Sequence, residues 1–234
     1  MVGELEHRVV GGHACIARRD ADTHRDARAF RAGGDLAVDA TDTAFALLAY
    51  KMLQAKGLKK GDYQVKPLGA PLARLQAMAS DPNIAVAILS PPQTAMAQKA
   101  GLKNFGTAVS VIGPYQSDAG WVLRSWGEAN ADTLVRYIQA NIEGSRWALN
   151  PANRAALTAL LVERLKQPPD IIEQSLKVSL DQNGYAPDAR FDMAGFENAL
   201  KLRADMLGTW GGNPPPPASK YLDLSHYQKA LAGL

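Results

Sequence analysis

The chain has a single cysteine, few histidines and almost no excess of charge. Each of these shortages argues against certain classes of site or partner. With Cys15 as its only cysteine, it can form no internal disulfide and no cysteine-cluster metal site. Lysine and arginine number 26 against 23 acidic residues, so the net charge of +3 gives no argument for a nucleic-acid partner. No apolar run approaches the roughly 18 residues of a membrane-spanning helix, so we expect a protein that does not itself span a membrane.

Apolar residues make up 47% of the 234 residues and charged residues 21%, which is typical of a folded chain of one or two domains. Residues 1–34 differ from the rest, because they hold three of the four histidines, six arginines and no lysine. They show neither helical nor strand periodicity. We therefore predict an atypical, poorly ordered N-terminal segment, or an artificial start. Its His7, His13, Cys15 and His24 match no common zinc spacing, so no metal site is predicted.

A regular alternation of strands and helices begins at residue 35. Apolar runs bounded by turn residues predict strands at 35–40, 64–68 and 84–89. Capping residues and helix-opening prolines predict helices at 44–56, 71–78 and 90–100. Such βαβ units build a parallel or mixed sheet with right-handed crossovers and helices on both faces. Residues 35–113 are thus predicted to form an α/β lobe.

The pattern changes in the second half of the chain. Two short strands are expected at 109–112 and 121–123. Beyond them the sequence predicts helices at 131–149, 150–165, 171–180, 192–207 and 225–232. Residues 114–234 are therefore expected to be mostly helical.

Groups that could carry catalysis are scarce. His226 is the only histidine beyond residue 34, and it stands beside a helix start, where a surface or capping role is expected. The sequence contains no nucleophile elbow, no dinucleotide-binding glycine pattern and no phosphate-binding loop. These absences predict no catalytic residues and no cofactor.

Two turns at the carboxyl ends of predicted strands carry polar side chains that suit a binding site. Ligands of open α/β sheets bind at this edge, where the N-termini of helices favour anions. The candidate residues are Asp39, Thr41, Asp42, Thr43, Ser90, Pro91 and Gln93. The hydroxyl and amide donors favour a carboxylate or a sulfonate, whereas the two aspartates favour an amine or a pyrimidine-like group. The alternative interpretation is that these residues only cap helices.

Residues 34–48, with the sequence GDLAVDATDTAFALL, resemble the segment that opens the second lobe of certain ABC-transporter solute-binding proteins. The branch concerned is the nitrate/sulfonate/taurine-like and thiamine-precursor-like group. Further matches follow in the order that this group shows: GDY at 61–63, AILSPP at 87–92, GPYQ at 113–116, NPANR at 150–154 and YLDLS at 221–225. The resemblance covers residues 35–234.

The resemblance implies a type II periplasmic binding fold, in which a small ligand is held without catalysis in a cleft between two lobes. It implies that Tyr115 or Gln116, at the return hinge, faces the cleft and adds to the contacts from the two turns. Residues 114–234 would supply the hinge return and the helical part that completes the other lobe. The implied partners are a small-molecule ligand and the membrane permease of an ABC importer.

Members of this group carry a secretion signal and the rest of the first lobe ahead of the matched region. The resemblance therefore implies a periplasmic protein that lacks the N-terminal half of its first lobe, or a cytoplasmic one if the start is real. Two alternatives stay open. One is an enzyme of the same fold, similar to a thiamine-precursor synthase or a menaquinone-pathway lyase, although the cysteine-rich motif of the former is missing. The other is a fragment without function.

Overall fold

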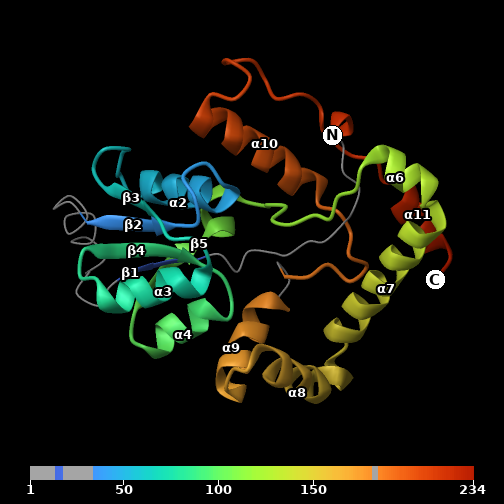
Figure 1. The fold of residues 1–234 in the computed structure, drawn as a ribbon, viewed down its shortest axis with the longest axis horizontal. Coiled ribbons are helices and arrows are strands. Elements are labelled where there is room, and N and C mark those ends of the chain that lie inside the picture. Colours follow the sequence, from blue (N-terminus) through green and yellow to red (C-terminus); the bar gives the residue numbers. More distant parts are fainter. Residues whose placement is uncertain (1–13, 18–33, 181–183) are drawn as a thin grey trace. The chain divides into compact units, whose positions relative to one another are not determined.

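The computed structural model describes residues 14–17, 34–180 and 184–234, and the chain divides into two compact units (Figure 1). The sheet unit contains the described residues of Gly11–Gly113 together with Ala199–Gly212. The helical unit contains the described residues of Pro114–Asn198 and Asn213–Leu234. Gly113, at the division, has a φ of 76°, which glycine adopts without the steric cost that a Cβ would bring.

The sheet unit is built on five strands in the order β3-β2-β4-β1-β5. The strands are β1 (Ala14–Ala17), β2 (Asp35–Val38), β3 (Gln64–Pro67), β4 (Ile84–Leu89) and β5 (Lys103–Thr107). Its helices are α2 (Ala44–Ala55), α3 (Pro71–Ser80), α4 (Gln93–Lys99) and α5 (Ala108–Ile112), while α10 (Met193–Leu207) has residues in both units. Strand β2 pairs in parallel with β3 and with β4, Leu36 lying opposite Val65 and Val86. The predicted parallel strands are therefore confirmed.

Strand β1 was not expected, because it lies inside the segment predicted to be poorly ordered. Ala14–Ala17 runs antiparallel between β4 and β5, with Cys15 opposite Ile88 and Ala14 opposite Thr107. The structure corrects the prediction for these four residues. Residues 1–13 and 18–33 of the segment lie outside the described part of the chain. A strand this short, with no alternation around it, leaves no periodic signal in the sequence.

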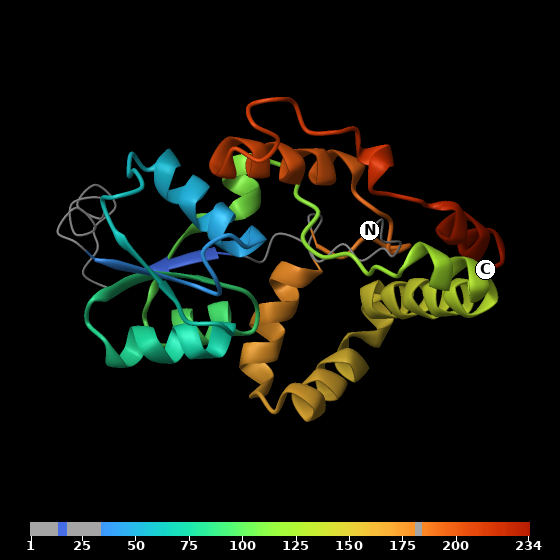
Figure 2. The same cartoon turned by 45° about the horizontal axis from the view of Figure 1, so that its top comes forward.

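Helices cover both faces of the sheet, as predicted: α2 lies on one face, and α3 and α4 lie on the other (Figures 1 and 2). On the α3–α4 side, Met78 and Ala97 pack with Ala37, Ala87 and Leu89 in one buried cluster. Burying a Leu or Met side chain contributes about 1.5–3 kcal/mol. The apolar side chains between the sheet and its covering helices thus form the core of this unit.

The predicted strand at 109–112 is wrong, because these residues belong to helix α5. The β-branched run there favours a strand, but Thr107 starts a helix instead. Its Oγ1 accepts a hydrogen bond from the Ser110 amide at 3.3 Å, and Ser110 Oγ donates to the Thr107 carbonyl at 2.6 Å. The strand lies just before, at β5. Residues 121–123, the other expected strand, have no strand structure either.

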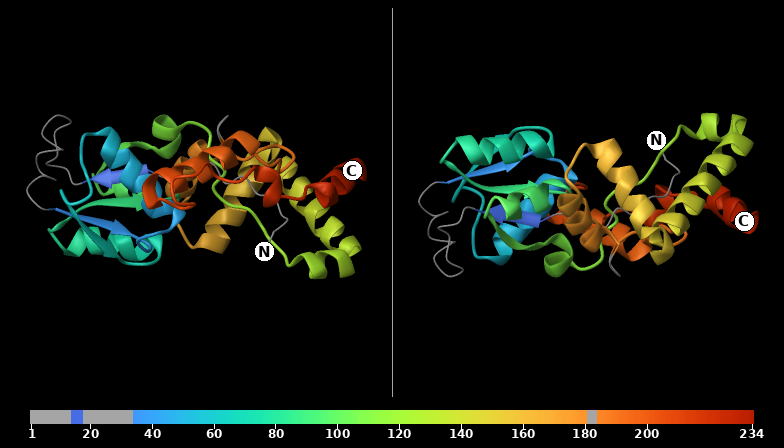
Figure 3. Two further views of the ribbon diagram at one scale, coloured as in Figure 1. Left: turned by 90° about the horizontal axis from the view of Figure 1, so that it is seen from above. Right: turned by 90° about the horizontal axis from the view of Figure 1, so that it is seen from below.

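The helical unit contains α6 (Arg124–Ala129), α7 (Ala131–Leu149), η1 (Pro151–Asn153), α8 (Arg154–Leu165), α9 (Pro169–Ser179), η2 (Ala218–Lys220) and α11 (Ser225–Ala232). The long helix predicted at 131–149 is confirmed to the residue. Helix α11 packs along α7 (Figure 3), where Leu134, Ile138 and Ile142 meet Tyr227 and Ala230. The spacing of four residues on α7 places its three apolar side chains on one stripe.

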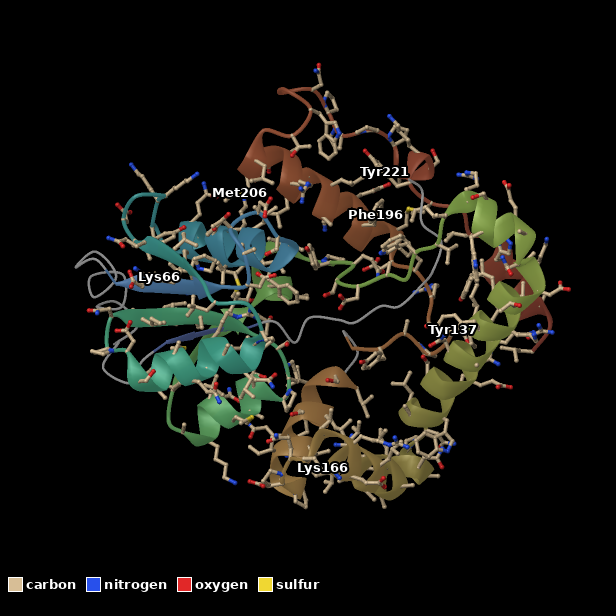
Figure 4. All side chains as sticks on the ribbon, in the orientation of Figure 1. Lys66, Tyr137, Lys166, Phe196, Met206 and Tyr221 are labelled. Carbon is tan, nitrogen blue, oxygen red and sulfur yellow. The ribbon has the colours of Figure 1, made fainter. Side chains whose placement is uncertain are left out.

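A second apolar cluster and an aromatic contact complete the packing inside this unit. Leu157 of α8 packs with Ile172 and Leu176 of α9. Phe196 and Tyr221 lie edge to face with ring centroids 6.2 Å apart (Figure 4). Among the described residues, no helix combines the length and the apolar character needed to cross a membrane.

Candidate functional site

The turn that follows β2 is organised around Thr43, the N-cap of helix α2. Thr43 Oγ1 accepts a hydrogen bond from the Ala46 amide at 3.2 Å, and so satisfies one of the free donors of the first helical turn. The same hydroxyl donates to Asp39 Oδ1 at 2.6 Å. Thr43 therefore caps the helix, as one interpretation of the sequence expected, and one carboxylate oxygen of Asp39 holds the cap in place.

Thr41 and Asp42, the tip of this turn, are exposed. The carbonyl of Thr41 accepts a hydrogen bond from the Tyr50 hydroxyl at 3.0 Å, which ties the tip to the next turn of α2. Burial raises the pKa of Tyr50, and the negative charges of Asp39 and Asp42 raise it further. The phenol therefore stays protonated and donating, while the side chains of Thr41 and Asp42 face solvent.

The second turn, at residues 90–93, follows β4. Ser90, Pro91 and Gln93 are each half-buried, and the Ser90 carbonyl accepts a hydrogen bond from the Thr94 amide at 3.2 Å. Strands β2 and β4 are parallel neighbours, so their carboxyl ends and the two turns share one edge of the sheet. The structure thus brings seven of the nine predicted site residues to this edge, which we call the carboxyl edge.

Tyr115 and Gln116, the remaining two, belong to the helical unit and are buried there. The Gln116 side chain bridges two backbone segments: its Oε1 accepts from the Asp192 amide at 2.9 Å, and its Nε2 donates to the Asp118 carbonyl at 2.5 Å. A Cβ on Gly195 would come within 2.5 Å of the Gln116 nitrogen, so the backbones approach closely here. These contacts give Gln116 a structural role, and a ligand contact from either residue stays a prediction.

Arg74 on α3 is a residue that the sequence analysis missed. Its side chain is 1% exposed, lies beneath the carboxyl edge and donates from Nε to the Ile88 carbonyl at 2.9 Å and from Nη1 to the Gly69 carbonyl. Burial lowers the pKa of Arg74, and the negative charge of Asp39 opposes that shift. The available signal was positional, since Arg74 stands four residues before the buried Met78 on the stripe of α3 that faces the sheet.

A hollow of about 410 Å3 lies elsewhere, within the helical unit. It is lined by Ala140, Asn141, Gly144, Ser145, Ala148, Leu157, Leu161, Leu176, Leu180 and Tyr185. None of the predicted site residues borders it. Across the described ranges, no three His, Cys, Asp or Glu side chains gather where they could hold a metal ion. His226 lies at the start of α11, with its Nδ1 3.4 Å from Ser225 Oγ.

No family model and no curated protein matches the chain, but solved structures resemble it throughout. A protein from Bordetella bronchiseptica RB50 is 16% identical with a TM-score of 0.78, over 99% of this chain and 75% of that one. The periplasmic nitrate-binding protein NrtA from Synechocystis PCC 6803 is 14% identical with a TM-score of 0.77, over 98% and 67%. The ligand-binding component of an ABC-type import system from Staphylococcus aureus is 17% identical with a TM-score of 0.73, over 96% and 74%.

These similarities show the fold: the chain has the α/β architecture of the ligand-binding components of ABC importers, as its sequence predicted. The same fold also carries chemistry, because the desulfurization enzyme DSZB is similar as well, 15% identical with a TM-score of 0.67. The fold class is therefore confirmed.

Proposed function

We propose that this chain is the solute-binding component of an ABC importer and that it takes a small organic anion, such as a sulfonate or a carboxylate, at the carboxyl edge. The observation that carries the proposal is the N-terminus of α2. It lies at this edge, directly after the exposed turn residues Thr41 and Asp42. The partial positive charge of a helix N-terminus favours an anion.

The state of Asp39 favours an anion over an amine. One of its carboxylate oxygens accepts a hydrogen bond from the Thr43 hydroxyl at 2.6 Å. A carboxylate oxygen that is engaged in this way is less available to the N–H donors of an amine. Thr41 is exposed and Ser90 and Gln93 are half-buried, and their neutral side-chain donors suit sulfonate or carboxylate oxygens.

The similar structures support the transport role that we propose. NrtA is described as a periplasmic nitrate-binding protein, and another similar structure is an alkanesulfonate-binding protein SsuA bound to MOPS. We infer for this chain a small-molecule ligand, delivery to a membrane permease and a place in the periplasm. The resemblance of residues 34–48 to the second-lobe segment of such proteins supports the same inference.

A thermal-shift screen tests the proposal with nitrate, alkanesulfonates and short carboxylates on one side and alkylamines and aminopyrimidines on the other. A bound ligand at 100 times its dissociation constant stabilises the folded chain by about 2.7 kcal/mol. We expect saturable stabilisation by an anion and none by the amines. Stabilisation by amines alone would reverse the assignment of the ligand class, and a lack of response to every class would count against a binding function.

An enzyme of the same fold is the second candidate, and the similarity to DSZB is the observation that favours it. The two candidates differ in what happens to the ligand. A binding protein returns the ligand unchanged, whereas an enzyme consumes it. Mass spectrometry of each stabilising compound after long incubation with the protein therefore separates them, with a denatured sample of the chain as the control.

A further inference from the structure

We propose that Arg74 is a positioning residue, which fixes the two turns of the carboxyl edge by tying the end of β4 to the segment that follows β3. The inference deepens the proposed function and rests on it, because it concerns the framework of the same site. Arg74 itself is buried and does not contact the solvent-facing side of the turns. Its effect on a ligand is therefore indirect.

A continuous path of hydrogen bonds leads from β4 to the first turn through this guanidinium. Arg74 Nε donates to the carbonyl of Ile88, the next-to-last residue of β4, and Nη1 donates to the carbonyl of Gly69. The amide of Gly69 in turn donates to the Asp39 carbonyl at 3.2 Å, and the Asp39 carboxylate holds the hydroxyl of Thr43. The last link lies within the turn after β2, and the others join different segments, so we expect a displacement at one link to reach the next.

The chemistry of arginine suits this task better than that of lysine. The planar guanidinium presents N–H donors in a fixed fork, so one side chain can hold two carbonyls in a set relation. Its Cζ also lies 6.0 Å from the centre of the Phe45 ring, in the first turn of α2, within the range of a cation–π contact. Arg74 thus touches the segment after β3, the end of β4 and the start of α2.

Burial makes the arrangement sensitive to the loss of this side chain. Arg74 is one of five polar or charged residues buried among the described ones. Removing the guanidinium takes its hydrogen bonds from the carbonyls of Ile88 and Gly69. Arg74→Met keeps most of the side-chain volume and the apolar stem. Any change that it causes is therefore due to the loss of the guanidinium donors and of the positive charge.

Amide hydrogen exchange of the free protein, followed by NMR, tests the proposal without a ligand. In Arg74→Met, we expect the amides of Gly69 and Ala46 to exchange about tenfold faster relative to core amides of β4, equivalent to about 1.4 kcal/mol. Met78→Ala is the matched control, because Met78 is equally buried one turn further along α3. It should lower global stability but leave the relative exchange of Gly69 and Ala46 unchanged.

Arg74→Lys carries the same comparison if Arg74→Met does not fold, since it keeps the charge but lacks the fork. We expect Gly69 to exchange faster in this variant as well, with the effect at Ala46 reduced. Equal exchange patterns in the Arg74 and Met78 variants would make Arg74 a packing residue and overturn the proposal. Because no ligand enters the measurement, a failed ligand screen leaves its result unaffected and the two proposals fail separately.

Discussion

Thr43 and Asp39, four residues apart, are joined by a hydrogen bond of 2.6 Å from the threonine hydroxyl to the carboxylate. The same hydroxyl accepts from the Ala46 amide, so one side chain serves both the turn and the helix. The sequence alone is compatible with two roles for these residues, ligand contact or helix cap. The geometry separates their roles from that of Thr41, whose side chain faces solvent.

Replacement of the cap should therefore act on stability. We expect Thr43→Ala to lower the free energy of unfolding by about 1 kcal/mol, since it removes the acceptor for the Ala46 amide. Thr43→Ser keeps the hydroxyl and serves as the control that should retain most of this stability. Urea unfolding of the three proteins makes the comparison, and equal stability of the alanine and serine variants would show that the hydroxyl contributes nothing.

Thr41→Ala should act on binding and leave the fold unchanged. Its side chain is exposed, and the bond to Tyr50 uses the Thr41 backbone carbonyl, which the substitution retains. Loss of one ligand hydrogen bond weakens affinity roughly two- to tenfold, equivalent to about 0.5–1.5 kcal/mol. Titration calorimetry with the anion selected by the screen measures the change. An unaltered dissociation constant would remove Thr41 from the site.

Gly195 offers a stability test within the helical unit. A Cβ there would lie 2.5 Å from the Gln116 nitrogen and 2.8 Å from the Tyr115 carbonyl carbon, both of which are backbone atoms. We expect Gly195→Ala to destabilise the fold by about 1–3 kcal/mol through overpacking. Gly144 on α7 is the matched control, because a Cβ there meets nothing within 4 Å. Gly144→Ala should stabilise by about 0.5–1 kcal/mol, and destabilisation by both would contradict the argument.

The pH dependence of stability should depend on Tyr50. Its pKa is raised above the ordinary value of 10.0 by burial and by the charges of Asp39 and Asp42, so folding favours the protonated phenol. The protonated phenol therefore adds to the free energy of unfolding. This contribution is complete below pH 10 and is lost as the pH rises through the higher pKa of the folded state. Unfolding measurements across this range should show the stability gap between the wild type and Tyr50→Phe narrowing with pH. A constant gap would mean that the phenol does not titrate differently in the two states.

The sequence predicted those elements whose pattern is repeated or capped. Strand β4 is identified by a continuous apolar run, which indicates burial on both faces. Helix α7 is identified by the four-residue spacing of Leu134, Ile138 and Ile142, which indicates one buried face. The turns at the carboxyl edge were likewise predictable, since they follow recognisable strands. The strand assigned to residues 109–112 failed because the β-branched run outweighed the cap at Thr107.

Arg74 escaped prediction for a different reason. A charged residue on a helix is ordinarily assigned to the solvent face, and here the hydrogen bonds to the carbonyls of Gly69 and Ile88 make its burial tolerable. Those acceptors come from two segments that meet only in the folded chain. Contacts between distant segments carry no local pattern, so residues of this kind are found from structure.

Strand β1 has a consequence for how this chain behaves when it is shortened. It is four residues long, yet it lies between β4 and β5 and pairs with both of them. Among the described strands, β1 is the one that pairs with β5, so a chain that starts after Ala17 would leave β5 unpaired and would turn β4 from an interior strand into an edge strand. An unpaired edge made of apolar residues recruits strands from other molecules. These few residues therefore protect the sheet against self-association, and a shortened chain should be judged first by whether it remains monomeric.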